Sequence, residues 1–282
     1  MLHILTSKSE LKKVVEETEK LLPGIFPVHY ALRFQLESKF EGVKYENFCY
    51  PWPAPTHFCV ICFNPRTPEP QAFIHIPEKF ESGFFEVLTS DYFSRPPGIL
   101  LSTLEKPVAE FLEKILKDRG HFEYFTFTEM FYMKPEAQSE LMSEVLVPPD
   151  GYYFDDLKEK DIPVLVETWR YSEPNEYEGM KLKIQNLPSA AIRIEGTDQL
   201  AAFEIVALEG IMNHLFTAVE HRRKGLGTLV EKRLAQKLIR ANVMPCKFTD
   251  LAHDDACQFT KTSKIWTKND VKMGVWAYFS AK

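Results

Sequence analysis

The fold is decided by residues 216–242, which read FTAVEHRRKGLGTLVEKRLAQKLIRAN. The first of these residues predict a short β-strand that ends at Val219. The segment from Thr228 onward predicts an amphipathic helix, because its apolar residues recur every three or four positions. Between the two lies an Arg-x-x-Gly-x-Gly motif at residues 222–227. The expected unit is therefore a strand, a glycine-containing loop and a helix.

The loop of this unit has the features of an anion-binding site. Gly225 and Gly227 allow the backbone to approach a ligand closely, and the first N–H groups of the following helix have no partner within that helix. Arg222, Arg223 and Lys224 add positive charge at an end of the helix where cations oppose its dipole. The pattern predicts a bound anion, typically a phosphate. The other interpretation is a glycine-rich turn beside a solvated basic cluster.

The helix after the loop has one apolar face, which is expected to pack on a core. That face is formed by Leu226, Leu229, Val230, Leu234 and Leu238. The polar side chains fall on the other faces and comprise Glu231, Lys232, Arg233, Gln236 and Lys237.

The composition is that of a folded, acidic protein. A chain of 282 residues suits two domains of ordinary size. Hydrophobic residues make up 45% and charged residues 26%, which supports a full core rather than global disorder. The net charge of -6 and the pI of about 5.8 argue against a general nucleic-acid binder. The sequence does not indicate an oligomeric state.

The five cysteines, an odd number at low density, indicate reduced thiols inside a cell. Cys59 and Cys62 have the spacing of a redox or metal motif. They lie in an apolar run, residues 57–63, without a second cysteine pair or a neighbouring pair of histidines. Buried strand cysteines are therefore the better interpretation, and no metal site is expected.

No apolar run approaches the roughly 20 residues that a membrane-spanning helix needs, and the first residues lack the core of a signal peptide. Residues 8–22 instead predict a helix, with Ser7 and Glu10 as a capping box. The acidic residues of this segment argue against a mitochondrial transit peptide. We therefore expect an intracellular protein, cytoplasmic or mitochondrial, without a membrane span.

The first half of the chain mixes strands and helices and contains no glycine-rich phosphate loop or catalytic constellation. Strands are predicted at residues 28–36, 45–50, 57–63, 72–76 and 122–131, and a helix at residues 101–117. The stretch Val-Pro-Pro-Asp-Gly at residues 147–151 is the best domain boundary, because two prolines and a glycine favour a linker or a sharp turn.

The second half reads as a complete α/β unit. Its order is strand, helix, helix, three strands, loop, helix, strand, helix, strand. Short turns at residues 195–198 and 209–210 favour hairpins between the three consecutive strands. The predicted elements cover residues 152–154, 161–169, 180–187, 190–194, 200–208, 213–219, 228–242, 243–250, 254–266 and 275–279.

This order and the Arg-x-x-Gly-x-Gly loop resemble the Gcn5-related N-acetyltransferase (GNAT) superfamily. Residues 200–225, LAAFEIVALEGIMNHLFTAVEHRRKG, are similar without gaps to glycine N-acyltransferases. Those proteins carry a Glu-aromatic-Arg run before the glycine, which here is Glu220-His221-Arg222, with histidine in place of the aromatic ring. The resemblance implies a mixed α/β fold of two tandem GNAT-like units. Residues 1–147 would be a degenerate copy and residues 148–282 the acyl-CoA-binding catalytic domain.

The resemblance also implies the chemistry. Acyl-CoA would supply an acyl group to the amine of a small acceptor, such as glycine or another amino acid. Glu220 would be the general base, because an amine must lose a proton to attack a thioester; the alternative is an anion favoured only by the helix end and the basic residues. In the superfamily the two central strands separate beside the cofactor. The residues expected to contact it are Thr217, Ala218, Val219, Arg222, Arg223, Lys224, Gly225, Leu226, Gly227 and Thr228.

Other residues offer weaker candidates. His221 could assist as a base, and His214 reads as a packed or surface residue. Asp250, His253, Asp254 and Asp255 could line an acceptor pocket, although helix capping by Asp254 is the better interpretation. Cys246 and Cys257 have no histidine partner by spacing, which disfavours a cysteine nucleophile.

Two other functions remain open at this point. The chain could be a catalytically silent acyl-CoA-binding or interaction protein, since its first half already reads as a silent copy. It could also acetylate protein lysines or N-termini.

Overall fold

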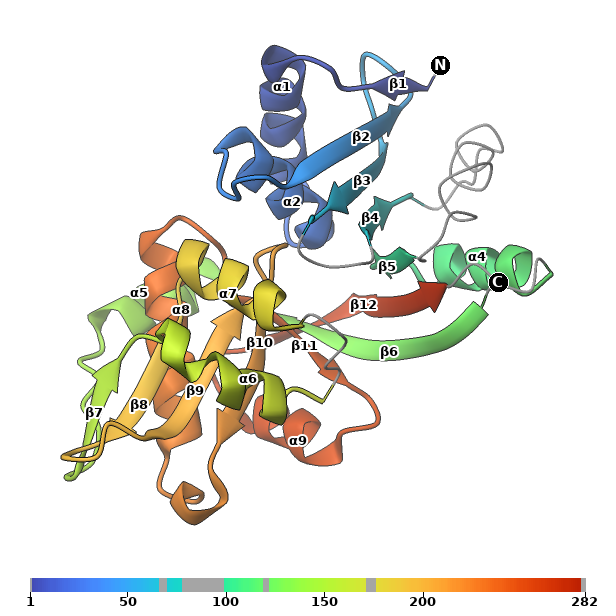
Figure 1. Cartoon of the computed structure of the whole chain (residues 1–282). Coiled ribbons are helices and arrows are strands. Elements are labelled where there is room, and N and C mark those ends of the chain that lie inside the picture. Colours follow the sequence, from blue (N-terminus) through green and yellow to red (C-terminus); the bar gives the residue numbers. More distant parts are fainter. Residues whose placement is uncertain (1, 66–69, 78–98, 119–121, 171–175, 280–282) are drawn as a thin grey trace. The chain divides into compact units, whose positions relative to one another are not determined.

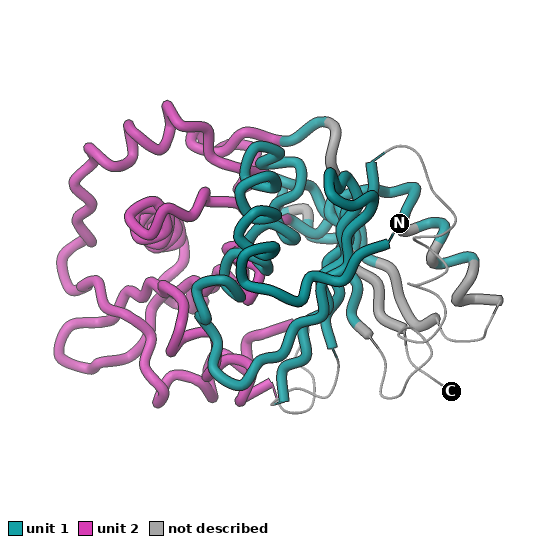
Figure 2. The backbone as a smooth tube through the Cα atoms, turned by 90° about the horizontal axis from the view of Figure 1, so that it is seen from above, with its two compact units in different colours: residues 1–130, 249–257, 269–282 teal, residues 131–248, 258–268 magenta. Residues whose placement is uncertain are grey.

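The computed structural model describes residues 2–65, 70–77, 99–118, 122–170 and 176–279. The chain divides into two compact units (Figure 2). Unit 1 comprises Met1–Met130, Thr249–Cys257 and Asn269–Lys282, and unit 2 comprises Phe131–Phe248 and Gln258–Lys268. The C-terminal segments are thus shared between the units. The domain boundary at residues 147–148 and the degeneracy of the first domain remain predictions.

Unit 1 is built on a mixed β-sheet (Figure 1). Its strands are β1 (His3–Ile4), β2 (Lys44–Tyr50), β3 (His57–Phe63), β4 (Gln71–His75), β5 (Ile99–Thr103), β6 (Phe122–Tyr132) and β12 (Thr267–Phe279). They lie in the order β1-β2-β3-β4-β5-β12-β6. Strands β1 to β4 pair antiparallel, β4 and β5 parallel, and β5 and β12 antiparallel. The strands predicted at residues 45–50, 57–63, 72–76 and 122–131 are confirmed, with ends shifted by one residue at most.

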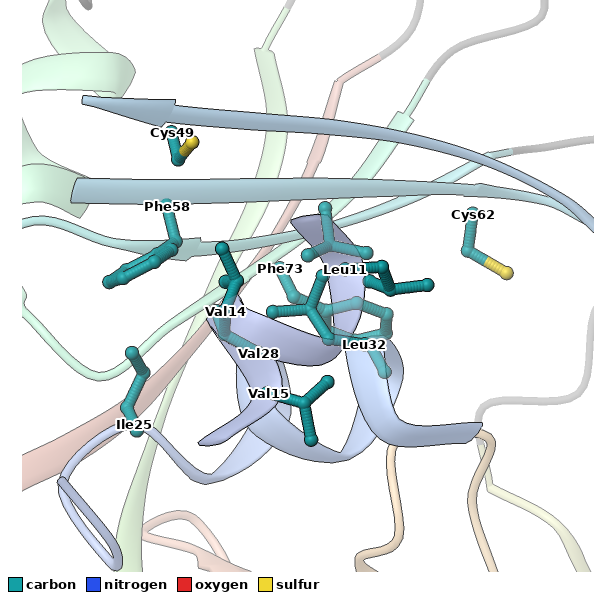
Figure 3. Close-up of a cluster of buried hydrophobic side chains, with 12 residues drawn as sticks. Leu11, Val14, Val15, Ile25, Val28, Leu32, Cys49, Phe58, Cys62 and Phe73 are labelled. Carbon is teal, nitrogen blue, oxygen red and sulfur yellow. The ribbon is translucent and has the colours of Figure 1, made fainter. Parts of the chain in front are cut away.

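Two helices of unit 1, α1 (Lys8–Glu19) and α2 (Phe26–Leu36), pack on strands β2 to β4 (Figure 3). The predicted capping box is present, because Ser7 accepts from the backbone of Glu10 and the Glu10 side chain accepts from the backbone of Ser7. The buried core between helices and strands includes Leu11, Val14, Val15, Ile25, Val28, Leu32, Cys49, Phe58, Cys62 and Phe73.

The structure corrects two predictions in this unit. The strand expected at residues 28–36 is wrong, because these residues form most of α2. Eight of the eleven residues of that helix are buried, so apolar residues occur on most of its sides and the sequence carries no clear helical period. Pro27 near the start suits the first turn of a helix. The helix expected at residues 101–117 begins later, because residues up to Thr103 form β5 and α4 spans Lys106–Asp118.

Cys59 and Cys62 are buried in β3, as predicted. Because they are three positions apart in a strand, their side chains project from opposite faces, and Cys62 joins the core of Figure 3. They cannot act together as a redox or metal pair in this arrangement. All five cysteines of the chain are free thiols.

Unit 2 contains the predicted antiparallel hairpins and one parallel pair. Its strands are β7 (Tyr152–Asp155), β8 (Ala190–Ile194), β9 (Leu200–Val206), β10 (Met212–Thr217) and β11 (Cys246–Asp250). They lie in the order β11-β10-β9-β8-β7, with β10 and β11 parallel and the others antiparallel. The hairpin turns predicted at residues 195–198 and 209–210 are confirmed.

Helices cover both faces of these strands (Figure 1). They are α5 (Pro135–Ser143), α6 (Ile162–Thr168), α7 (Glu176–Asn186) and α8 (Leu226–Arg240), with short 3-10 turns η2 (Glu159–Asp161) and η3 (Val219–His221). Helices α6 and α7 pack on one face and α8 on the other. Helix α9 (Asp254–Thr262) runs from unit 1 into unit 2. In the described ranges, no helix is both long and apolar enough to cross a membrane.

Two polar residues of α8 that the sequence assigns to its outer faces are buried. Gln236 donates to the carbonyls of Leu141 (2.8 Å) and Glu144 (2.9 Å) and so fixes α5. Helix α5 itself is not predicted from the sequence. Glu231 is fully buried and pairs with Lys247 of β11.

The pair of Glu231 and Lys247 belongs to a larger buried cluster. Trp266 Nε1 donates to the Glu231 carboxylate at 3.0 Å, and Glu204 of β9 is also buried, with Oε2 lacking a partner in the described part of the chain. Burial and the charge of Glu231 raise the pKa of Glu204 well above its ordinary value, against the opposing charge of Lys247. The folded protein therefore favours the neutral form of Glu204.

A second buried ion network fixes the outer strands. Arg193 of β8 is fully buried. Its guanidinium donates to Asp155 at 2.6 Å, and to both oxygens of Asp161 at 3.1 and 2.7 Å. The Arg193 guanidinium thus connects β7 and β8 to the turn that precedes α6. Removing one partner of such a pair typically costs about 3–5 kcal/mol, because the other charge is left buried.

Candidate functional site

Strand β10 is paired along one edge only, because its other edge separates from β11 after one residue pair. It pairs with β9 at four register positions, but with β11 at a single one, Met212 opposite Lys247. A bulge interrupts the β9 pairing between Asn213 and Phe216. Separation of the two central strands is what the GNAT resemblance implies. An edge of this kind can hydrogen-bond to an extended ligand in place of a neighbouring strand.

The loop after β10 ends in a helix that lacks a side-chain cap. Strand β10 ends at Thr217, two residues earlier than predicted, and α8 begins at Leu226, two residues earlier than predicted. The N-cap is Gly225, with φ of 78° in the left-handed region, and no side-chain oxygen bonds to the first turn. Arg223 also has a positive φ, 61°. The first N–H groups of α8 are thus left for a ligand.

The start of α8 lies against the end of β10. A Cβ atom on Gly227 would be 3.3 Å from Thr217 Oγ1, tighter than an ordinary contact. Arg222 Nε donates to the carbonyl of Thr217 at 3.1 Å. Gly227 therefore allows α8 to begin close to the end of β10, and Arg222 fixes the turn that leads into the loop. The approach of this backbone to a ligand remains a prediction.

Tyr152 of β7 anchors the basic loop and is not identified from the sequence. Its hydroxyl accepts from Lys224 Nζ at 2.8 Å and lies 2.8 Å from His221 Nδ1. The rings of Tyr152 and His221 meet edge to face, with centroids 5.6 Å apart. His221 thus keeps an aromatic contact at the position where the resembling family has an aromatic ring. No sequence signal reveals this contact, because the residues are 69 positions apart.

Glu220 lies in η3, directly after β10, and its side chain is exposed. Within the described part of the chain its carboxylate has no hydrogen bond or ion pair. It is therefore free to meet a substrate or a water molecule. Ala218, by contrast, donates its N–H to the carbonyl of Ala201 at 2.9 Å, so that amide is already used in the sheet. Val219 is 67% exposed.

His214 occupies the bulge of β10 and is not a surface residue. Its ring packs on Trp169 and Phe203, with centroids 4.8 and 5.0 Å away. Burial, followed by the charge of Lys183, lowers its pKa to about 3, against a hydrogen bond to the backbone of Thr168. His214 is therefore neutral at physiological pH.

The remaining candidates contribute less. Burial raises the pKa of the Cys246 thiol well above its ordinary value, which disfavours a thiolate nucleophile. Asp250, His253, Asp254 and Asp255 belong to unit 1. There α9 begins at Asp254 and the Asp250 carboxylate accepts from the N–H of Ala252 at 2.8 Å. The described residues contain no group of metal-ligating side chains able to hold an ion.

Comparison with known proteins identifies the fold. No family model and no curated protein sequence matches this chain. Among solved structures, a Drosophila protein matches 99% of this chain and 98% of its own, with a TM-score of 0.79 and 14% identity. A tandem GNAT protein from the clavulanic acid biosynthesis pathway matches 100% and 99%, with a TM-score of 0.60 and 11% identity. A GCN5-related N-acetyltransferase from Sphaerobacter thermophilus matches 100% and 96%, with a TM-score of 0.59 and 10% identity.

This chain has the fold of the GCN5-related N-acetyltransferases. The mixed α/β fold class predicted from the sequence is confirmed, including the likeness to a tandem GNAT protein over the full length. At these identities the likeness concerns the fold alone. The closer resemblance to glycine N-acyltransferases remains a prediction.

Proposed function

We propose that this protein is an acyl-CoA-dependent N-acyltransferase that acylates the amine of a small acceptor, such as glycine or another amino acid. One observation carries the proposal. Strand β10 pairs with β11 only at Met212 and leads directly into the glycine-containing loop and the uncapped start of α8. One strand thus offers a backbone edge for an extended arm and, at its end, a seat for phosphates.

The cofactor-binding residues follow from this arrangement. The pyrophosphate of CoA would lie at the start of α8, where backbone N–H groups and the helix dipole favour an anion. The arm would run beside the end of β10, with Ala218 contributing contacts other than its N–H. The proposed contacts are Thr217, Ala218, Val219, Arg222, Arg223, Lys224, Gly225, Leu226, Gly227 and Thr228.

The chemistry is attack of a neutral amine on a thioester. A C–N bond forms, the C–S bond breaks, and CoA leaves as the thiol once the amine proton has been transferred. A backbone N–H of β10 would stabilise the oxyanion of the intermediate. We propose Glu220 as the base, acting directly or through water. Its exposed carboxylate without an ion pair supports this role.

The cellular setting follows from the substrate and the thiols. We infer that the enzyme acts in the cytoplasm or in the mitochondrion, where its five free cysteines would stay reduced.

The test is release of CoA thiol from acetyl-, benzoyl- and longer acyl-CoA with a panel of amines, amino acids and peptides. Thiol release that requires a small amine, with the acylated amine identified by mass spectrometry, supports the proposal. CoA binding without turnover on any amine would indicate an acyl-CoA-binding protein instead. Turnover with peptides alone would indicate a protein acetyltransferase.

A further inference from the structure

The bulge in β10 changes where its side chains point. Asn213 pairs with Ile205 and Phe216 with Phe203, so three steps along β10 match two steps along β9. One residue is therefore extra, and His214 takes a φ of 52° to accommodate it. A positive φ is rare for a bulky residue. Bulges of this kind re-aim side chains and occur next to active sites.

Because of the bulge, two consecutive residues lie on the same face. Ile205 and Phe203 both belong to the core under α6 and α7. Residues paired across two strands share a face, so Asn213 faces the same side as Ile205. The His214 ring contacts Phe203 on that side as well. Asn213 and His214 therefore stand next to each other on the face of α6 and α7.

Asn213 and His214 each carry a side-chain atom that can accept a hydrogen bond. Thr168 Oγ1 donates to the carbonyl of Val164 at 2.7 Å and lies 3.0 Å from His214 Nε2. When Thr168 donates to Val164, its oxygen accepts from His214 Nε2–H, and this tautomer of His214 leaves Nδ1 as a bare acceptor. In the described part of the chain, neither His214 Nδ1 nor Asn213 Oδ1 has a partner, although both atoms are buried.

Two buried acceptors without a donor can be satisfied by a bound group that brings N–H or O–H donors. A neutral primary amine has two N–H bonds and one lone pair. It can donate to both acceptors and still direct its lone pair at a carbonyl carbon. A hydroxyl or a secondary amine has only one such donor to offer.

The pair lies at the reacting end of the strand. The phosphate seat is at the start of α8, next to Thr217. Residue 213 is four positions back along β10, but because of the bulge this span matches only three residues of β9, from Ala202 to Ile205, or about 10 Å at roughly 3.3 Å per residue. An arm that begins at the phosphate seat and follows β10 therefore brings its far end, the thioester, towards residues 213 and 214. A proton passing from an amine there to Glu220 would have to cross through water.

We propose that Asn213 Oδ1 and His214 Nδ1 bind the amine of the acceptor substrate, a small molecule with a primary amine. This proposal rests on the proposed N-acyltransferase function, and it names the site that selects the acceptor.

The first test uses two histidine substitutions with opposite geometry. In glutamine the amide end matches the position of Nε2, so His214→Gln keeps a partner for Thr168 and loses the acceptor at Nδ1. In asparagine the amide end matches Nδ1, so His214→Asn keeps that acceptor and loses the Thr168 bond. We expect His214→Gln and Asn213→Leu each to raise the KM for glycine about 3- to 10-fold, the value of one hydrogen bond. His214→Asn should stay closer to the parent, and CoA affinity should be unchanged in all three.

The second test does not depend on turnover. Protein labelled with ¹⁵N-histidine and saturated with CoA is titrated with glycine and with its N-methylated analogue sarcosine. The Nδ1 resonance of His214 should shift with glycine, and sarcosine should bind more weakly. An unchanged Nδ1 resonance, or a glycine KM that is equal in parent and His214→Gln, would overturn the assignment. If glycine shifts Nδ1 while no amine is ever acylated, the binding site stands and the proposed function falls.

Discussion

Replacing Gly225 by glutamate tests whether the loop holds a phosphate. Gly225 has φ of 78°, and a Cβ atom there would meet nothing within 4 Å. A Cβ atom at this position therefore causes no clash in the free protein, and the carboxylate of glutamate would enter the proposed phosphate site. Gly196, in the turn between β8 and β9, offers a matched control. It has φ of 74°, and a Cβ atom there would also meet nothing within 4 Å.

The expected magnitudes separate strain from binding. Each substitution places an L-residue in the left-handed region, at a cost of about 1–2 kcal/mol in the free energy of unfolding. In a chain of this size that lowers the Tm by about 2–8 °C. CoA at 100 times its Kd should add about 2.7 kcal/mol of stability to any protein that binds it. We expect this gain in the parent and in Gly196→Glu, and its loss in Gly225→Glu.

The assay is thermal unfolding with and without CoA, together with direct titration of CoA by calorimetry. Equal loss of Tm in the two variants without CoA confirms that the strain is matched. A gain from CoA in Gly225→Glu that equals the gain in Gly196→Glu would refute the phosphate seat at this loop. If CoA stabilises neither variant, the loss of CoA binding reflects the lower stability of the whole protein and not a change in the loop.

Glu220→Gln should lower turnover about 10²- to 10⁴-fold, the usual contribution of a positioned base. CoA affinity should be unchanged, and the deficit should shrink as pH rises, because more of the amine is then neutral. The same change at the exposed Glu195 should have no effect. Tyr152→Phe removes the hydroxyl that lies 2.8 Å from Lys224 Nζ and should raise the Kd for CoA about 3- to 10-fold. Glu204→Met should raise the free energy of unfolding at pH 7 by about 1–3 kcal/mol, because it removes a buried carboxyl with an unpaired oxygen.

The stabilisation expected for Glu204→Met should depend on pH. The pKa of Glu204 is raised in the folded protein, so its ionisation favours unfolding, and stability is lost as pH rises from about 4.3, the unfolded value, towards the folded pKa. The stability gained by Glu204→Met, measured by denaturant unfolding, should therefore grow with pH over that range, and a gain that does not change with pH would contradict the prediction.

Parallel pH–rate profiles for the parent and Glu220→Gln would remove Glu220 from the chemistry. If Tyr152→Phe leaves the Kd for CoA unchanged, the hydrogen bond from Lys224 to Tyr152 does not contribute to CoA binding.

The elements that the sequence predicts well are those with a local signal. The loop at residues 222–227 and the helix after it depend on glycine, on positive charge and on a period of 3.6, all of which lie within a few turns of chain. Helix α2 lacks such a signal, because it is buried almost all round and its run of apolar residues fits a strand equally well. Glu231 is misassigned for a related reason. Helical period places it among polar residues, whereas its partner Lys247 comes from a different element.

The candidate site divides in the same way. The proposed phosphate site lies in one continuous segment, so its loop and helix can be predicted from the sequence. The other end of the candidate site depends on one extra residue in β10. Regular alternation puts His214 and Phe216 on one face, which is correct, but it puts Asn213 on the opposite face. The bulge brings Asn213 round to stand beside His214, and without it the two acceptors would be separated by the sheet. If Asn213 and His214 bind the amine, the selection of the substrate depends on a backbone irregularity that no pattern of residue types specifies.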